Sequence, residues 1–156
     1  MARAVRECDT ALAAAEEAAD REELATELGG THRQFAELLV RSAPEEAADA
    51  EEAGEAGDPA IRAAFEAALE ELSRAVAVFA TLGAAGLHHR TGAELAAGRL
   101  EADLGRPARA AARARGVLAA YEGAGERDET ARARREEAAH LLEAAHKRAG
   151  EDAERG

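Results

Sequence analysis

The sequence has little of what builds strands, disulfides or aromatic cores. It contains no tryptophan, four other aromatic residues, six valine and isoleucine residues, and three prolines in 156 residues. Because strands are built mainly from aromatic and β-branched residues, this shortage excludes a β-rich fold. The single cysteine, Cys8, excludes an internal disulfide and favours a reducing compartment.

The sequence also lacks long apolar runs, and it has little lysine and no net positive charge. No stretch approaches the ~18 apolar residues of a membrane span, and no signal-peptide core is present, so we expect a cytoplasmic protein without membrane contact. Lys147 is the one lysine beside 19 arginines, and 32 acidic against 20 basic residues give a net charge of −12. This negative field disfavours nucleic acid as a partner.

Alanine dominates what is present. The chain has 46 alanines, 15 leucines, 5 valines and 3 phenylalanines. Alanine is the best helix former but buries little surface, so the core must come from close approach of helices rather than from bulky side chains. The composition and length predict an all-α fold in a single domain, residues 1–156.

Apolar residues at spacings of three and four predict about six helices. Asp20 with Glu23 forms a capping-box pattern that places a break between the first two helices. The second helix is expected to carry its large apolar residues, from Leu24 to Leu39, on one face. The expected helices cover residues 2–19, 21–41, 59–82, 87–104, 107–121 and 127–149.

The third expected helix, 59–82, has the strongest apolar pattern and is predicted to organise the core. Gly83 follows it, where a left-handed residue commonly ends a helix. Residues 42–58 carry acidic and small side chains and are predicted to be a solvated insertion. The last helix, 127–149, has a weak apolar stripe and is predicted to cap the domain. Residues Ile61, Phe65, Leu69, Leu72, Val76 and Phe79 form the pattern of the third helix.

The segment 91–121 resembles the tetratricopeptide repeat family, a helix–turn–helix unit of about 34 residues. Gly98, Gly105 in a Leu-Gly turn, Ala110 and Leu118 stand where the family has Gly, Gly, Ala and Leu. A weaker match places Leu28-Gly29 at the earlier Leu-Gly of the pattern. Glu94, Glu101 and His32 depart from it, because they occupy positions that the family fills with large or aromatic residues.

The resemblance implies antiparallel helix hairpins stacked as a short right-handed α-solenoid, whose concave groove binds a peptide or protein segment. Carried over by position, the groove residues that the resemblance implies are Glu23, Thr26, Arg33, Leu95 and Arg99. Arg33 and Arg99 would be the anchors, since a guanidinium grips a carboxylate through two parallel hydrogen bonds.

No arrangement of residues predicts catalysis. The two Glu-x-x-His motifs, ending at His140 and His146, lie on one helix and point about 240° apart, so they do not converge on a metal. We therefore expect no catalytic residues, no metal and no cofactor. The main hypothesis is a non-enzymatic interaction module, which could form part of a regulator. The alternatives are a structural bundle that self-associates through its end helices, 2–19 and 127–149, and a nucleic-acid-linked transcriptional regulator that uses the arginines of 88–115.

Overall fold

The computed structural model describes the backbone of residues 2–52, 57–125 and 127–155, and the side chains of 17–44, 59–125 and 127–151. These residues form five helices and no strand, which confirms the all-α prediction. Cys8 and the acidic side chains of 45–58 lie outside the described side chains. The helices are α1 (Ala2–Glu52), α2 (Gly57–Ala80), α3 (Leu87–Asp103), α4 (Pro107–Ala124) and α5 (Glu129–Arg155).

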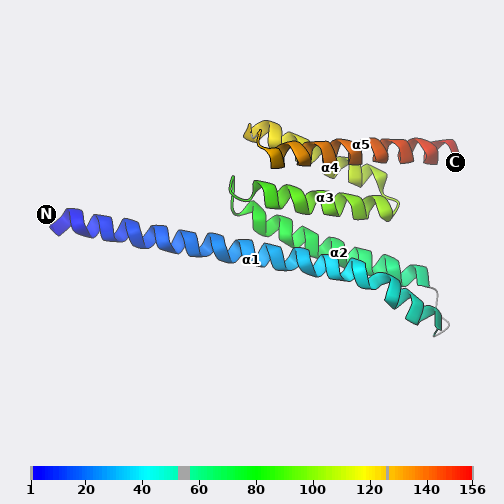
Figure 1. The fold of residues 1–156 in the computed structure, drawn as a ribbon, viewed down its shortest axis with the longest axis horizontal. Coiled ribbons are helices and arrows are strands. Elements are labelled where there is room, and N and C mark those ends of the chain that lie inside the picture. The colour runs from blue at the N-terminus through cyan, green and yellow to red at the C-terminus, as the bar shows by residue number, and fades with distance from the viewer. Residues whose placement is uncertain (1, 53–56, 126, 156) are drawn as a thin grey trace.

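The expected break at Asp20 is wrong, because α1 runs without interruption through the two helices expected there. The residues around Asp20 are alanine, glutamate and arginine, whose helix propensity outweighs one capping pattern. α1 also continues through Pro44 into the segment expected to be an insertion, and its ribbon bends in its last turns (Figure 1). Of residues 42–58, expected to form an insertion, 42–52 belong to α1 and 57–58 to α2.

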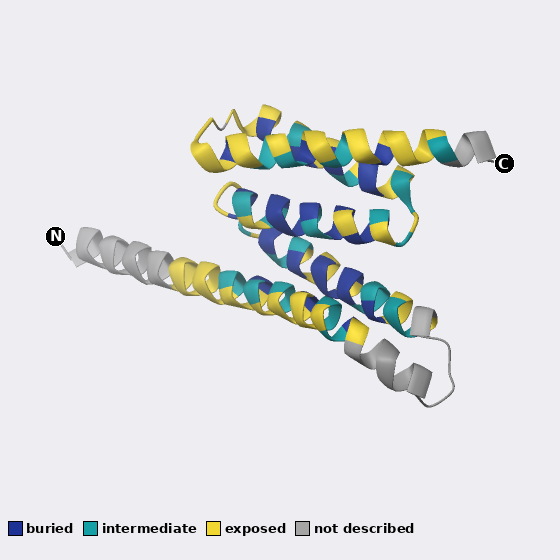
Figure 2. Ribbon diagram, turned by 45° about the vertical axis from the view of Figure 1, so that its right-hand side comes forward, coloured by how far each residue is buried: buried dark blue, intermediate teal, exposed yellow. Residues whose placement is uncertain are grey.

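Each helix packs against the next along the chain and runs in the opposite direction (Figure 1). α3 has three neighbours, since it contacts α2, α4 and α5. Its small residues permit this close packing, and Figure 2 shows α3 as the most completely buried helix. α3 therefore lies between its neighbours.

Two hydrophobic clusters each contain buried residues of α3. The first joins α1, α2 and α3, with Leu72 and Phe79 among its buried members, so the predicted core role of α2 is confirmed. The second joins α3, α4 and α5 around Leu95 and Tyr121. α5 adds Ala131 and further alanines to the core side, while its outer face stays exposed.

Glycines end three of the helices in the left-handed conformation. Gly83 follows α2 with φ of 58°, as its position after the apolar pattern predicts. Gly125 follows α4 with φ of 69° and donates its backbone N–H to the carbonyl of Tyr121. Gly105, with φ of 72°, ends the α3 turn two residues before Pro107 starts α4.

The face of α1 that packs on α2 is not the face expected from its large residues. Gly29, Ala36 and Ala43 are buried, whereas most of the large apolar residues of this helix are half exposed or more, and Leu39 alone among its leucines at 24–39 is partly buried against the core. An ideal Cβ on Gly29 would lie 2.5 Å from the ring of Phe79. The small residues therefore let α1 and α2 approach closely, and the apolar stripe beside them stays uncovered. The exposed large residues are Leu24, Leu28, Phe35 and Leu38.

We predict that Gly29→Ala destabilises the protein by about 1–3 kcal/mol, because the added methyl group overpacks against the buried Phe79 ring. The matched control is Gly30→Ala, where no atom lies within 4 Å of an added Cβ. This control is expected to stabilise α1 by about 0.5–1 kcal/mol, since alanine is the better helix former. Urea unfolding of both variants measures the difference, and equal stabilisation by the two substitutions would contradict the packing described.

Candidate functional site

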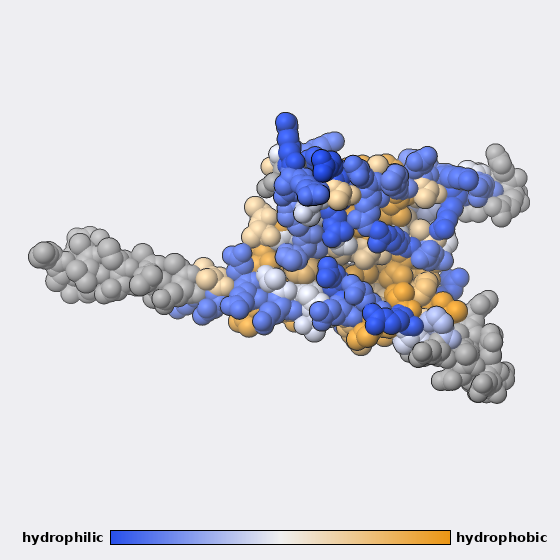
Figure 3. Space-filling view, in the orientation of Figure 1, coloured by the Kyte–Doolittle hydropathy of each residue, from blue (hydrophilic) through white to orange (hydrophobic). Residues whose placement is uncertain are grey.

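A groove lies between α1 and α3, with α2 at its base. Its volume is about 460 Å³, within the ~300–1,000 Å³ usual for ligand clefts. Figure 3 shows hydrophobic side chains gathered between the levels of α1 and α3, with charged side chains around them. We call this region the α1–α3 groove. Its lining residues are Ala36, Glu37, Val40 and Arg41 from α1, Leu72 from α2, and Ala96, Arg99, Leu100 and Asp103 from α3.

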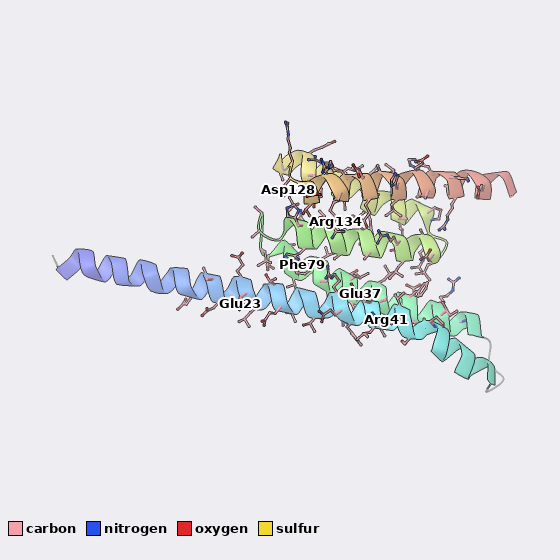
Figure 4. All side chains as sticks on the ribbon, viewed as in Figure 1. Glu23, Glu37, Arg41, Phe79, Asp128 and Arg134 are labelled. Carbon is pink, nitrogen blue, oxygen red and sulfur yellow. The ribbon has the colours of Figure 1, made fainter. Side chains whose placement is uncertain are left out.

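The charges of the groove lie on its two rims. Glu37 and Arg41 project from α1, where Figure 4 labels both, and Arg99 and Asp103 come from α3. Arg99 pairs with Glu137 of α5, so one rim of the groove is fixed to the last helix. The groove thus has an apolar floor with paired positive and negative groups at its edges.

Small residues on α3 bring α5 close to this rim. An ideal Cβ on Gly92 would lie 2.8 Å from the guanidinium of Arg134, and one on Gly98 would lie 2.7 Å from Leu141. Arg134 also donates to Glu137 at 3.0 Å, so the carboxylate of Glu137 is held between two arginines. The two glycines of α3 therefore determine where the charged rim lies.

The structure separates the residues that the family resemblance assigned to a groove. Arg99 lines the α1–α3 groove, and Arg33 lies one turn before Glu37 and pairs with it at 3.7 Å. Glu23 is exposed on the part of α1 that precedes its contact with Phe79 (Figure 4). The hydroxyl of Thr26 donates to a backbone carbonyl of its own helix at 2.8 Å. Glu23 and Thr26 are therefore not brought to the groove.

Leu95 is a correction, because it is 1% exposed and belongs to the core between α3, α4 and α5. Position-by-position transfer placed it in the groove, but the face of α3 that carries Leu95 is covered by its neighbours. Sequence reasoning missed the apolar floor on Ala36, Val40, Ala96 and Leu100. The i, i+4 spacing of these residues on two helices was the available signal.

A second polar cluster connects α3, α4 and the start of α5. The buried hydroxyl of Tyr121 lies 2.8 Å from that of Thr91 and 3.0 Å from Nδ1 of His88. The other ring nitrogen of His88 lies 3.2 Å from the carboxylate of Asp128. Because Tyr121 is completely buried, its hydroxyl reaches no substrate, and the chain of hydrogen bonds acts as a structural tie.

Three of the six arginines of 88–115, namely Arg99, Arg106 and Arg113, pair with acidic side chains. Arg106 pairs with Glu66 and lies 3.5 Å from Glu101, while Arg113 donates to Glu94 at 2.6 Å. The hydrogen bond from Arg106 holds the pKa of the Glu66 carboxyl below its usual value. These contacts join helices and neutralise charge that a nucleic-acid surface would need.

The described part of the chain contains neither a cluster of metal ligands nor a helix that could span a membrane. No three His, Cys, Asp or Glu side chains gather there in a way that could hold a metal ion. None of the helices searched has a stretch long and apolar enough to cross a membrane.

The charge of Asp128 generates a pH prediction. Its pKa lies below the ordinary value of 3.8, chiefly because its carboxylate accepts the backbone N–H of Ala131 at 2.7 Å, with His88 adding to the effect. A carboxyl group whose pKa is lower in the folded chain stabilises that state above its unfolded pKa. This contribution is lost as the pH falls through the folded value.

We therefore predict that Asp128→Asn, which keeps an N-cap acceptor, loses less unfolding free energy than the wild type between about pH 6 and about pH 3. Urea unfolding at both pH values measures the change. Glu23→Gln is the control, because it removes an exposed carboxylate from α1 without touching this connection. Identical losses in Asp128→Asn and wild type would contradict the assigned role.

Comparison with known proteins adds no family to this description. No family model, no curated protein and no solved structure matches the chain. The function therefore has to be argued from the α1–α3 groove and the surfaces around it.

Proposed function

We propose that the chain is a non-enzymatic protein-interaction module that binds a peptide segment in the α1–α3 groove. The observation that carries the proposal is the groove itself, which combines an apolar floor with charged rims on two rigid helices. Such clefts commonly bind through an apolar anchor, while a few polar groups fix its orientation.

The helix order supports a solenoid-like arrangement around this groove. α1 with α2 and α3 with α4 form antiparallel hairpins, and α3 also contacts α5. In this proposal α1, α3 and α5 present one continuous concave side, as stacked hairpins of the tetratricopeptide type would. Arg99 with Glu137 joins two of these three helices along that side.

The lining chemistry defines the segment that fits. Val40, Leu72 and Leu100 provide apolar contact for one or a few hydrophobic side chains. Arg41 on one rim and Asp103 on the other are exposed and can meet groups of opposite charge. The favoured ligand is therefore a short segment with a hydrophobic anchor flanked by an acidic and a basic residue.

A catalytic or nucleic-acid function receives less support from the same geometry. His88, the histidine that takes part in the hydrogen bonds between α3, α4 and α5, contacts the buried Tyr121 and does not line the groove. Arg106 and Arg113 pair with glutamates, and the whole chain carries a net charge of −12. Both observations favour recognition of a protein segment.

The proposal predicts that a random-peptide display library, selected against the full chain, yields peptides with a hydrophobic anchor. Ala96→Trp fills the groove and is expected to weaken their binding at least about tenfold, as loss of a central contact does. Asp103→Arg, on the exposed rim, is expected to change which flanking charge is preferred without filling the core. Fluorescence anisotropy of the labelled peptides measures both effects.

Ala119→Trp is the matched control, because Ala119 is exposed on α4 and does not line the groove. Circular dichroism checks that all variants retain their helix content. If the selected peptides bind Ala96→Trp as tightly as the wild type, or if selection yields no peptide, the groove does not serve as the proposed binding site.

A further inference from the structure

The large apolar side chains that α2 leaves uncovered form a straight stripe along α1. Leu24, Leu28, Phe35 and Leu38 are between 50% and 63% exposed. Thr31 and Ser42 continue the same line, so positions 24, 28, 31, 35, 38 and 42 alternate steps of four and three residues. Alternation of four and three is the heptad spacing by which one helix pairs with another. We call these six positions the α1 stripe.

The α1 stripe is separate from both the α2 contact and the α1–α3 groove. α2 packs on the face that carries Gly29 and Ala36. α1 lines the groove with Ala36, Glu37, Val40 and Arg41, none of which belongs to the stripe. At about 100° per residue, Val40 lies roughly 160° around the helix from Leu24. Figure 3 shows hydrophobic side chains among the charged ones along the lower edge of the molecule, over α1.

The length of α1 indicates that its partner is another helix. Gly29 lies against Phe79, and α2 ends one residue later at Ala80, whereas α1 begins at Ala2. The N-terminal half of α1 therefore extends past the end of α2 (Figure 1). Helices in water gain most of their stability from packing an apolar face, so an extended helix with an uncovered heptad pattern lacks part of that stabilisation.

The charges beside the stripe indicate a second copy of the same chain. Glu27, Gln34 and Arg41 are exposed, seven residues apart, along the edge of the stripe that faces away from α2. When two such helices pair in opposite directions about a two-fold axis, this edge meets the same edge of the second copy. Gln34 then lies opposite itself, and Glu27 lies opposite Arg41 of the second copy.

The same register aligns the apolar residues. Leu28 meets Leu38 of the second copy, and Phe35 packs beside Thr31 of the second copy. In a parallel pair, the charged edge would instead face the edge with Ala25 and His32, where α2 packs and where His32 lies 2.7 Å from Glu71. The charge pattern is therefore complementary to itself in the antiparallel direction only.

We propose that the protein forms a homodimer through the α1 stripe, with the two α1 helices packed antiparallel and Glu27 of each copy paired with Arg41 of the other. This surface differs from the end segments 2–19 and 127–149 considered in the sequence analysis. The stripe lies outside the α1–α3 groove, but Arg41 belongs to both surfaces, so the dimer leaves the apolar floor open and withdraws one rim charge from a bound peptide.

Sedimentation equilibrium of the full chain tests the dimer. The wild type is expected to be dimeric at micromolar concentrations. Leu28→Glu/Leu38→Glu is expected to raise the dimer dissociation constant at least about a hundredfold, because it buries four carboxylates in the paired stripe. Ala139→Glu/Ala144→Glu adds the same charge to exposed positions of α5 and is expected to leave the dimer unchanged.

Charge reversal tests the direction of pairing. Glu27→Arg alone and Arg41→Glu alone each place like charges opposite each other and are expected to weaken the dimer, while the double reversal restores it. Gln34→Cys, in a Cys8→Ser background, is expected to form a disulfide between copies under oxidation, because the antiparallel axis passes beside this position.

Several results would overturn the proposal. A wild-type chain that stays monomeric at high micromolar concentration excludes the dimer. A dimer that resists Leu28→Glu/Leu38→Glu shows that another surface pairs. A double reversal that stays as weak as its single variants, or the absence of the disulfide in a dimer, excludes the antiparallel register.

Discussion

The close approach of helices to α3 is the constraint on which the rest of the structure depends. With 46 alanines and few large residues, the chain cannot fill wide spaces between helices. α3 therefore packs closely against α2, α4 and α5. Its small buried residues are Gly92, Ala93, Ala97 and Gly98. Two of the three hydrophobic clusters of the described residues include buried residues of α3, so its small residues help to set the positions of the helices around it.

The α1–α3 groove is a consequence of the same packing. α1 approaches α2 through glycine and alanine, while the space between α1 and α3 leaves an apolar floor open at Val40 and Leu100. Glu137 of α5, held by Arg99 and Arg134, keeps the α3 rim in place. A groove of this kind needs few bulky side chains, since the arrangement of the helices provides its shape.

The helical fold and most helix positions follow from the sequence because alanine content and three-four spacing act locally. Gly83 and the core role of α2 were equally local, since a left-handed cap and a strong apolar face need no tertiary information. The continuous α1 was missed because a capping pattern at Asp20 competes with strong helix formers on both sides. The face of α1 that packs on α2 was not predicted, because two helices approach closely through small residues, whereas side-chain size alone favours the face that carries the leucines.

The groove could be predicted only in part. The family resemblance correctly assigned Arg99 to a groove. It also assigned Leu95, which is buried in the core and does not line the groove. Tertiary contacts also decide the roles of His88 and Asp128, which lie 40 residues apart and meet only when α5 returns to α3. The spacing of residues along the sequence does not predict that α5 packs back on α3.

The sharing of α3 by two clusters also divides the molecule into two cooperative units. Loss of α5 and α4 would leave the cluster of α1, α2 and α3 with its own buried Leu72 and Phe79, whereas loss of α1 would leave the Tyr121 cluster whole. Amide protons of α3 should therefore exchange most slowly with solvent, since both units must open before its backbone is free. The centre of the chain, rather than either end, is then the last part of the fold to be lost.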